Sequence, residues 1–321
     1  MPMQYGEIRG IDKPVSRLAQ GTIMIKSGEM DASFALLDGV FELGCTLFDT
    51  AHVYGGGDNE RTFGKWVNDR GLRDKVVVLA KGAHHNADRR RVTPFDITAD
   101  LHDSLARFGF DYIDLYVLHR DDPAVPVGPV VEALNEHKQA GLIRAFGGSN
   151  WSHTRIAEAN EYAEAHGLEG FAVSSPQFSL AEMVREPWAG CVSISGPSQE
   201  EARLWYRQHD VALVPWSSLA RGFLSGRVRR DGPAPAEQRD ELGIESFGSK
   251  ANYERVERAA RLAEKKGLTI PQVALAYVLN QPLNVFPLVG CWSSEEFRAN
   301  LDVLEIELSQ EEIAFLELRD S

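Results

Sequence analysis

Two hydrophobic periods alternate along the chain and predict a repeated strand–helix architecture. Short apolar runs such as VVVLA and IDLYVL have the length and the β-branched content typical of buried parallel strands. Longer stretches between them carry apolar residues at helical spacing. We predict eight strands, near residues 18–23, 46–49, 76–80, 113–118, 145–148, 172–175, 212–215 and 285–289. Strands that alternate with helices in this way indicate an α/β fold built from βα units.

The amphipathic stretches between these runs are predicted to be helices. Several begin at Asn, Ser, Thr or Asp and end at Gly, the residue types preferred at the two ends of a helix. Seven such helices are expected at residues 34–43, 60–68, 95–108, 130–140, 154–166, 199–208 and 253–266. Three more are expected at residues 271–280, 295–304 and 310–318, the first with Pro271 in its opening position.

Residues 227–250 differ from the rest of the chain, because they are rich in Arg, Pro, Gly and Asp and show no sustained period. Such a segment predicts a long loop. Two interpretations remain open: a lid over a cofactor or substrate, and a disordered insertion.

Composition agrees with one large globular unit. The chain has 321 residues, 43% hydrophobic and 25% charged, which is enough for a single core, and no segment has the composition of a linker. We therefore expect one domain spanning residues 1–321. The formal charge of -13 argues against nucleic acid or an anionic membrane as a partner, since both require a basic surface.

The chain shows no membrane, secretion, disulfide or metal pattern. No apolar run approaches the roughly 18 residues of a membrane span, and the first residues lack a signal sequence, so a cytoplasmic location is expected. Cys45, Cys191 and Cys291 are isolated and odd in number, which favours reduced thiols. The adjacent pair His84 and His85 is not a sufficient ligand set, so no metal is expected.

Four polar residues lie where β-rich apolar runs end: Asp49 and Tyr54 in TLFDTAHVYG, Lys81 in VVVLAKG and His119 in DLYVLHR. In a barrel of parallel strands all such ends open on one face, so these residues can converge on one site. Each also has a structural interpretation when taken alone, as a loop cap, a turn aromatic, a solvated strand end or a surface histidine. Their joint placement favours a catalytic site.

The residue types indicate a proton donor for a carbonyl group. A phenol is a poor acid at neutral pH unless a nearby cation stabilises its phenolate. Lys81 is the candidate cation, and we expect it to lower the pKa of Tyr54 into the neutral range. Asp49 is expected to pair with Lys81 and hold it charged, while His119 can hydrogen-bond a substrate oxygen or relay a proton.

Five ordered motifs carry a family resemblance: FDTAHVYG, LAKG, LHRDDP, GGSN and PWSSLARGFLSG. With them the chain resembles the aldo-keto reductase superfamily from about Arg17 to Leu304. The resemblance implies a (β/α)8 TIM barrel with extra C-terminal helices. It also implies an N-terminal β-hairpin, formed here by residues 4–8 with residues 10–12, that plugs the bottom of the barrel.

The resemblance implies a reaction and a role for each of the four residues. The reaction is reversible hydride transfer between a nicotinamide cofactor, usually NADPH, and an aldehyde or ketone. Tyr54 would be the general acid, Lys81 the modulator of its pKa, Asp49 the partner of Lys81, and His119 the group that orients the carbonyl.

The resemblance also implies where the cofactor lies, and no G-x-G-x-x-G motif offers an alternative dinucleotide site. Amide and hydroxyl groups would hold the nicotinamide carboxamide, an indole would stack on its ring, and a following loop would lie along the pyrophosphate. The implied cofactor-binding residues up to that loop are Gly21, Thr22, Asp49, Ser149, Asn150, Gln177, Trp216, Ser217, Leu219, Arg221 and Gly222.

The segment after the eighth strand leaves the choice of cofactor open. NADPH-preferring members commonly have a basic residue there, whereas this chain has Gly290, Trp292 and Glu296. A carboxylate beside a phosphate is unfavourable. A short helix starting here can still bind a phosphate at its N-terminus. NADP(H) is expected first, with NAD(H) or dual use as the rival, and the further candidate contacts are Gly290, Ser293, Arg298 and Asn300.

The substrate is not defined by these motifs, and we expect a small carbonyl compound or alcohol, such as an aldehyde, ketone or keto-sugar. Candidate pocket residues are Met24, Ile25, His85, Trp151, Trp188 and Phe223. Two other functions remain open. One is a cofactor-sensing regulatory subunit without significant turnover, as the potassium-channel β subunits of this superfamily suggest. The other is a barrel lyase or epimerase that uses Lys81 as a Schiff-base amine.

Overall fold

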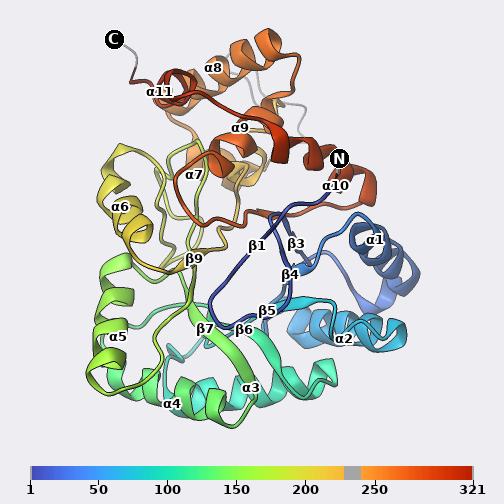
Figure 1. Cartoon of the computed structure of the whole chain (residues 1–321), viewed down its shortest axis with the longest axis vertical. Coiled ribbons are helices and arrows are strands. Elements are labelled where there is room, and N and C mark those ends of the chain that lie inside the picture. The colour runs from blue at the N-terminus through green and yellow to red at the C-terminus, as the bar shows by residue number, and fades with distance from the viewer. Residues whose placement is uncertain (1, 228–239, 320–321) are drawn as a thin grey trace.

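The computed structural model describes residues 2–227 and 240–319. Eight parallel strands form one curled sheet in the order β10-β3-β4-β5-β6-β7-β8-β9, so that neighbours in the sheet are neighbours along the chain except at β10 (Figure 1). The strands are β3 Ala19–Gly21, β4 Leu47–Asp49, β5 Val77–Gly82, β6 Ile113–Leu118, β7 Ile143–Ser149, β8 Val173–Ser175, β9 Ala212–Leu213 and β10 Leu288–Val289.

The two ends of the sheet meet and close it into a barrel. Leu288 of β10 is in register with Ala19 of β3, while Val285, just before β10, forms a parallel bridge with Leu213 of β9. Hydrogen bonds from Leu213 N to the Asn284 carbonyl at 2.8 Å and from Phe286 N to the Leu213 carbonyl at 2.7 Å complete the junction. The predicted eighth strand, residues 285–289, therefore joins β9 to β3, and the TIM-barrel prediction is confirmed.

Helices follow the strands and surround the barrel, with α1 to α5 around one part of it and α8, α9 and α11 gathered at the top of the view (Figure 1). The helices are α1 Met30–Glu42, α2 Asp58–Arg70, α3 Pro94–Phe108, α4 Val127–Gln139, α5 His153–Ala165, α6 Glu200–Gln208, α7 Glu241–Phe247, α8 Lys250–Lys266, α9 Ile270–Leu279, α10 Ser294–Leu301 and α11 Gln310–Leu316. Short 3-10 turns are η1 Ser27–Glu29, η2 Tyr54–Gly57, η3 Pro197–Gln199, η4 Ala220–Gly222 and η6 Asp302–Glu305.

Local sequence explains where these helices begin and end. At the start of α3 the Thr93 side chain accepts a hydrogen bond from Asp96 N, and Pro94 occupies the first helical position, where a missing N–H costs nothing. At the end, Gly109 adopts a φ of 66°, a left-handed conformation that side chains disfavour. Such caps place the helix limits close to those predicted from the sequence.

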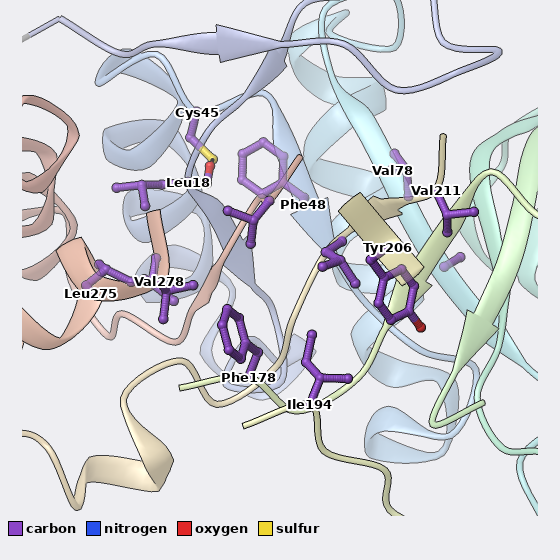
Figure 2. Close-up of a cluster of buried hydrophobic side chains, with 14 of the residues drawn as sticks. Leu18, Cys45, Phe48, Val78, Phe178, Ile194, Tyr206, Val211, Leu275 and Val278 are labelled. Carbon is purple, nitrogen blue, oxygen red and sulfur yellow. Dashed lines mark hydrogen bonds between the residues drawn. The ribbon is translucent and has the colours of Figure 1, made fainter. Parts of the chain in front are cut away.

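The strands bury both faces, and the two sets of side chains form separate apolar layers. Leu47, Val77 and Leu79 point into the barrel and pack with other apolar residues there. Phe48 and Val78 alternate with them and belong to the outer layer, between the strands and the helices (Figure 2). This period of two on strands buried on both sides explains why they read as continuous apolar runs.

The N-terminal hairpin is present, but its second strand is not the predicted one. β1 Tyr5–Gly6 pairs antiparallel with β2 Val15–Ser16, and residues 10–12 lie in the connection between them. Ile8 and Val15 are buried in the inner layer with the barrel strands, so the hairpin closes one end of the barrel. Residues 10–12, predicted as the second part of the hairpin, lie in the connection instead, where Gly10 has a φ of 84°, a left-handed conformation that suits a turn.

The segment predicted as one long loop contains a helix. α7 Glu241–Phe247 occupies its C-terminal part, and Lys250 already begins α8, whereas residues 228–239 lie outside the described residues. A helix of seven residues is too short to show a clear period in the sequence, but Phe247 is fully buried and anchors it in the core. Among the described helices, none combines the length and apolar character needed to cross a membrane.

Candidate active site

The four candidate catalytic residues meet at the carboxyl ends of three neighbouring strands. Asp49 is the last residue of β4, Lys81 is the last but one residue of β5, and His119 directly follows β6. Tyr54 is the first residue of η2, the turn that follows β4. All four line one cavity of about 150 Å³. The parallel strands therefore bring together residues that are up to 70 positions apart in the sequence.

Lys81 and Asp49 form a buried ion pair at the floor of this cavity. Only 3% of Lys81 and 4% of Asp49 is exposed, and Lys81 Nζ donates to Asp49 Oδ1 and, at 3.1 Å, to the Thr50 carbonyl. Burial alone would lower the pKa of Lys81, but the charges of Asp49 and Tyr54 outweigh it and the net shift is upward. Lys81 is therefore held as an ammonium ion.

Tyr54 lies beside this ammonium and faces His119. Lys81 Nζ is 5.3 Å from the centroid of the Tyr54 ring, and the Tyr54 and His119 rings meet edge-on with centroids 6.0 Å apart. Burial raises the pKa of Tyr54, and the charge of Lys81 opposes this without reversing it. The expected lowering of the Tyr54 pKa into the neutral range is thus wrong, because the expectation from the sequence included the cation but not the desolvation of the phenolate.

His119 is neutral over the physiological pH range. Its pKa is lowered well below the ordinary value, first by burial and then by the nearby charges of Lys81 and Arg120. Its backbone N–H donates to the Gly82 carbonyl at 2.8 Å, which ties it to the end of β5, while its Nδ1 is buried without a partner. A neutral imidazole in this position can hydrogen-bond a substrate oxygen without carrying a charge.

Asn150 connects the catalytic residues to Trp216. Its side-chain amide donates to the His119 carbonyl at 3.3 Å and to Ser149 Oγ at 3.1 Å. Its Oδ1 accepts from Trp216 Nε1 at 3.2 Å and from Val192 N at 3.1 Å. Ser149, Asn150, Trp216 and Ser217 line the same cavity as the catalytic four. The amide already uses its hydrogen-bonding groups, so any ligand contact would replace one of these bonds.

Gln177 is held in a similar hydrogen-bond network, although it does not line this cavity. Its amide oxygen accepts from Ser193 Oγ at 2.5 Å and Ser195 Oγ at 3.0 Å, and its Nε2 donates to Ser179 Oγ at 2.9 Å. One Nε2 hydrogen remains available. Nearby at the end of β8, the buried Ser175 Oγ has no hydrogen-bond partner, which fits a site that receives a polar group from a ligand.

The loop after β9 has an unusual backbone. Ser217 and Arg221 have φ values of 52° and 53°, a left-handed conformation that costs energy for residues other than glycine. The Arg221 guanidinium is held by Asp240 at 2.8 Å and lies 4.9 Å from the centroid of the Trp188 ring. Strained backbone of this kind is typical of loops that present N–H groups to an anionic ligand.

The candidate phosphate site after β10 contains the carboxylate of Glu296. Ser293 caps α10 by accepting from Glu296 N at 3.2 Å, and the Glu296 carboxylate accepts from Trp292 N at 2.8 Å. The carboxylate therefore occupies the helix N-terminus, where a phosphate would bind. Arg298 is exposed, Asn300 donates to the Cys291 sulfur at 3.4 Å, and 72% of Trp292 is exposed.

Ten of the sequence-predicted cofactor residues do not line the catalytic cavity; they are Gly21, Thr22, Gln177, Leu219, Arg221, Gly222, Gly290, Ser293, Arg298 and Asn300. Gly21 ends β3, and the others follow β3, β8, β9 and β10, on the side of the carboxyl ends of the strands. The Thr22 hydroxyl lies 2.9 Å from the Asp49 carbonyl and 2.8 Å from Asn59 Oδ1, so it supports the strand that carries Asp49.

Arg120 and Cys191 line the catalytic cavity but were not predicted as site residues. In the sequence Arg120 stands in a charged turn, HRDD, and Cys191 is an isolated thiol. Arg120 directly follows His119, and this adjacency in the sequence was the only signal for it. Cys191 reaches the cavity from the segment after β8, and no local sequence signal indicated that. Within residues 2–227 and 240–319, no group of three or more His, Cys, Asp or Glu side chains has a metal-binding arrangement.

Comparison with known proteins agrees with this geometry. Residues 17–318 match the aldo/keto reductase family. The chain is 31% identical to norsolorinic acid reductase stcV of Emericella nidulans over 89% of this chain and 71% of that one. It is 28% identical to the aldo-keto reductase yakc [NADP(+)] of Schizosaccharomyces pombe, over 87% and 79% of the two chains.

A solved structure shows the same fold at lower identity. The glycerol dehydrogenase of Gluconobacter oxydans superposes with a TM-score of 0.76 at 23% identity, covering 98% of this chain and 96% of that one. The family match extends over nearly the whole sequence and includes every strand of the barrel. The chain therefore belongs to the aldo/keto reductase family of oxidoreductases.

Proposed function

We propose that this enzyme reversibly reduces an aldehyde or ketone to an alcohol with NAD(P)H, and that Tyr54 is its general acid and base. The observation that carries the proposal is the shared cavity, in which Tyr54 and His119 face each other above the buried pair of Lys81 and Asp49. A bound nicotinamide would supply the hydride to the carbonyl carbon.

The residues of this chain then manage the carbonyl oxygen and its proton. The neutral His119 imidazole orients the oxygen, and the Tyr54 hydroxyl gives it a proton, leaving a phenolate. The Lys81 ammonium stabilises that phenolate until solvent returns the proton. Asp49 is a positioning residue, since it holds Lys81 charged and in place. In the direction of alcohol oxidation, the phenolate accepts the proton from the alcohol.

The residues proposed to contact the cofactor lie at the carboxyl ends of the strands, where the catalytic cavity also lies. Trp216 would stack on the nicotinamide ring, and Ser149, Asn150 and Gln177 would hold its carboxamide. The loop of Ser217, Leu219, Arg221 and Gly222, with Gly21, Thr22 and Asp49, would lie along the rest of the dinucleotide. The unpartnered Ser175 hydroxyl and the strained backbone at Ser217 support a ligand here.

The Tyr54→Phe variant tests this function. It removes the donated proton and little else, so carbonyl reduction should fall about 10²- to 10⁴-fold. Binding of NADPH, followed by quenching of tryptophan fluorescence, should change less than about twofold, since Tyr54 is assigned no cofactor contact. The same experiment separates the alternative of a regulatory subunit, for which the unchanged protein would bind the cofactor yet show no carbonyl turnover to lose.

We propose NADP(H) as the preferred cofactor, with NAD(H) or dual use as the rival. The relative from Schizosaccharomyces pombe is named for NADP(+), and α10, which Ser293 caps, carries the guanidinium of Arg298 in its last turn. The carboxylate of Glu296 on the same helix opposes a phosphate. The preference therefore depends on which of these charges dominates.

A binding comparison of NADPH with NADH decides between them. If Arg298 holds the 2'-phosphate, Arg298→Ala should weaken NADPH binding about 10-fold, because a charge-assisted hydrogen bond is worth roughly 1.5 kcal/mol, and should leave NADH unchanged. The matched control is Arg261→Ala, which removes an exposed arginine from α8. Equal losses for both cofactors, or tighter binding of NADH by the unchanged protein, would contradict the assignment.

A further inference from the structure

One arginine beside the catalytic cavity is buried without a counter-ion. Arg120 directly follows His119 and is only 8% exposed. Its Nη1 donates to the carbonyl of its own neighbour His119 at 2.9 Å, and its Nη2 reaches no better acceptor than the sulfur of Cys191 at 4.0 Å. Its Nε is buried with no partner at all. In the described residues, no carboxylate forms an ion pair with it.

The single side-chain contact of Arg120 does not neutralise it. Burial raises the pKa of the Cys191 thiol, and Arg120 opposes this only in part, so Cys191 is an uncharged thiol at neutral pH. A guanidinium stays charged under the same conditions. Keeping such a charge buried without an opposite charge is unfavourable, so a protein rarely does so without a use for it.

The carboxylates around Arg120 are engaged elsewhere. Asp121 and Asp122, the next two residues of the chain, pair with Arg155 at 3.4 Å and with Arg90 at 3.2 Å. Glu186 accepts a hydrogen bond from Gly190 N at 2.9 Å and attracts Arg120 only over a longer distance. None of these three carboxylates forms an ion pair with Arg120, so its guanidinium keeps N–H groups that can bind a ligand.

Arg120 lies where the catalytic cavity meets a wider groove. It lines both, together with Asn150 and Cys191. Three more arginines line the groove, but each is paired: Arg89 with Asp96 at 2.6 Å, Arg90 with Asp122 at 3.2 Å and Arg91 with Asp100 at 2.6 Å. Of the four, Arg120 alone has no carboxylate partner in the part of the chain that the structure describes.

We propose that Arg120 binds a carboxylate of the substrate, so that this enzyme acts on aldehydes or ketones that carry an acid group. The proposal rests on the proposed function, because the carbonyl must reach Tyr54 and His119 while the acid group enters the groove. A guanidinium suits a carboxylate because its N–H groups lie in one plane and match the two oxygens. The ligand charge would balance the buried cation.

The test compares two aldehydes that differ only in charge, 4-carboxybenzaldehyde and its methyl ester. For the unchanged enzyme, kcat/KM should be at least about 10-fold higher for the acid, the effect of one charge-assisted contact. Arg120→Gln should abolish that ratio, and Arg120→Lys should restore part of it. Arg90→Gln, which removes an exposed and already paired arginine of the same groove, is the matched control and should keep the ratio. A ratio near one in the unchanged enzyme overturns the proposal.

A binding measurement keeps the two proposals separable. Calorimetric titration with 4-methylbenzoate requires no turnover, and 4-methylphenylphosphonate distinguishes a carboxylate from a phosphate-like group. If the unchanged protein and Arg90→Gln bind the benzoate and Arg120→Gln does not, the acid site is supported, whether or not an aldehyde is reduced. If in that case no aldehyde is reduced, only the proposed reductase function is overturned. Equal binding of the benzoate by all three proteins overturns the acid site, and a stronger loss for the phosphonate than for the benzoate overturns the choice of carboxylate.

Discussion

At the scale of single residues, burial decides how the site is charged. Lys81 and Asp49 are both almost fully buried and neutralise each other, so the pair keeps its charges where either alone would be costly. Tyr54 and His119 stand beside the pair and are themselves uncharged at neutral pH, because burial disfavours both the phenolate and the imidazolium. The site therefore holds one ion pair and two neutral groups that can donate or accept a hydrogen bond.

These directions predict a specific pH dependence. In the proposed mechanism Tyr54 must be protonated to reduce a carbonyl, and a pKa raised from the ordinary value of 10 keeps it so, while the lowered pKa of His119 keeps the imidazole neutral. Reduction should thus be nearly constant from about pH 6 to pH 9, and alcohol oxidation should rise through the same range as the phenolate fraction grows. Steady-state rates in both directions at saturating cofactor measure this. A fall of the reduction rate centred near neutrality would instead support a lowered Tyr54 pKa.

At the scale of elements, close contact between strands depends on glycine at one position. β7 carries Gly147 opposite Val173 of β8, and a methyl group on Gly147 would lie 1.7 Å from the Val173 carbonyl oxygen. Because that neighbour is backbone, it cannot rotate away as a side chain would. The approach also sets where β7 delivers Ser149 and Asn150 to the cavity, so packing and site geometry are linked here.

Gly147→Ala should therefore destabilise the protein and disturb the site. Overpacking a filled core costs about 1–3 kcal/mol, and here the strands themselves must separate, so a value at the upper end is expected. Urea denaturation followed by circular dichroism measures the free energy of unfolding. Gly28→Ala is the matched control, since no atom lies within 4 Å of the added methyl group. Equal stability of the two variants would show that β7 and β8 can shift at little cost.

At the scale of the whole molecule, contacts between distant parts of the chain close the barrel. Arg17 Nη1, just before β3, donates to Asn284 Oδ1 at 2.8 Å, and Asn284 Nδ2 donates to the Glu7 carbonyl of the hairpin connection at 3.0 Å. Together with the bridge between Leu213 and Val285, these bonds hold β3, β9 and β10 together. The junction therefore joins residues up to 277 positions apart in the chain.

We accordingly propose that residues 1–321 fold as one domain, and we expect a single unfolding transition. Tryptophans are spread from Trp66 on α2 to Trp292 before α10, so fluorescence reports on both halves, while far-ultraviolet circular dichroism reports on all helices. Urea curves from the two probes should coincide in midpoint and slope. Two separated transitions would indicate that the barrel consists of independently stable parts.

The sequence alone determined the repeating pattern and the residues at its strand ends. Apolar runs and caps are local signals, which is why the eight strands, most helices and the meeting of Asp49, Lys81 and His119 could be predicted. The same locality explains two errors. The return strand of the hairpin and the seven-residue α7 have little signal of their own and are held by tertiary contacts.

The tertiary structure decided every property that depends on what surrounds a residue. The direction of the Tyr54 pKa results from burial outweighing a nearby cation, and burial cannot be read from neighbours in the sequence. Among the described residues Arg120 has no carboxylate partner, because Asp121 and Asp122, the next two residues of the chain, form ion pairs with other arginines. Local pattern thus predicts which groups reach the site, whereas only their environment in three dimensions sets their charge and their partners.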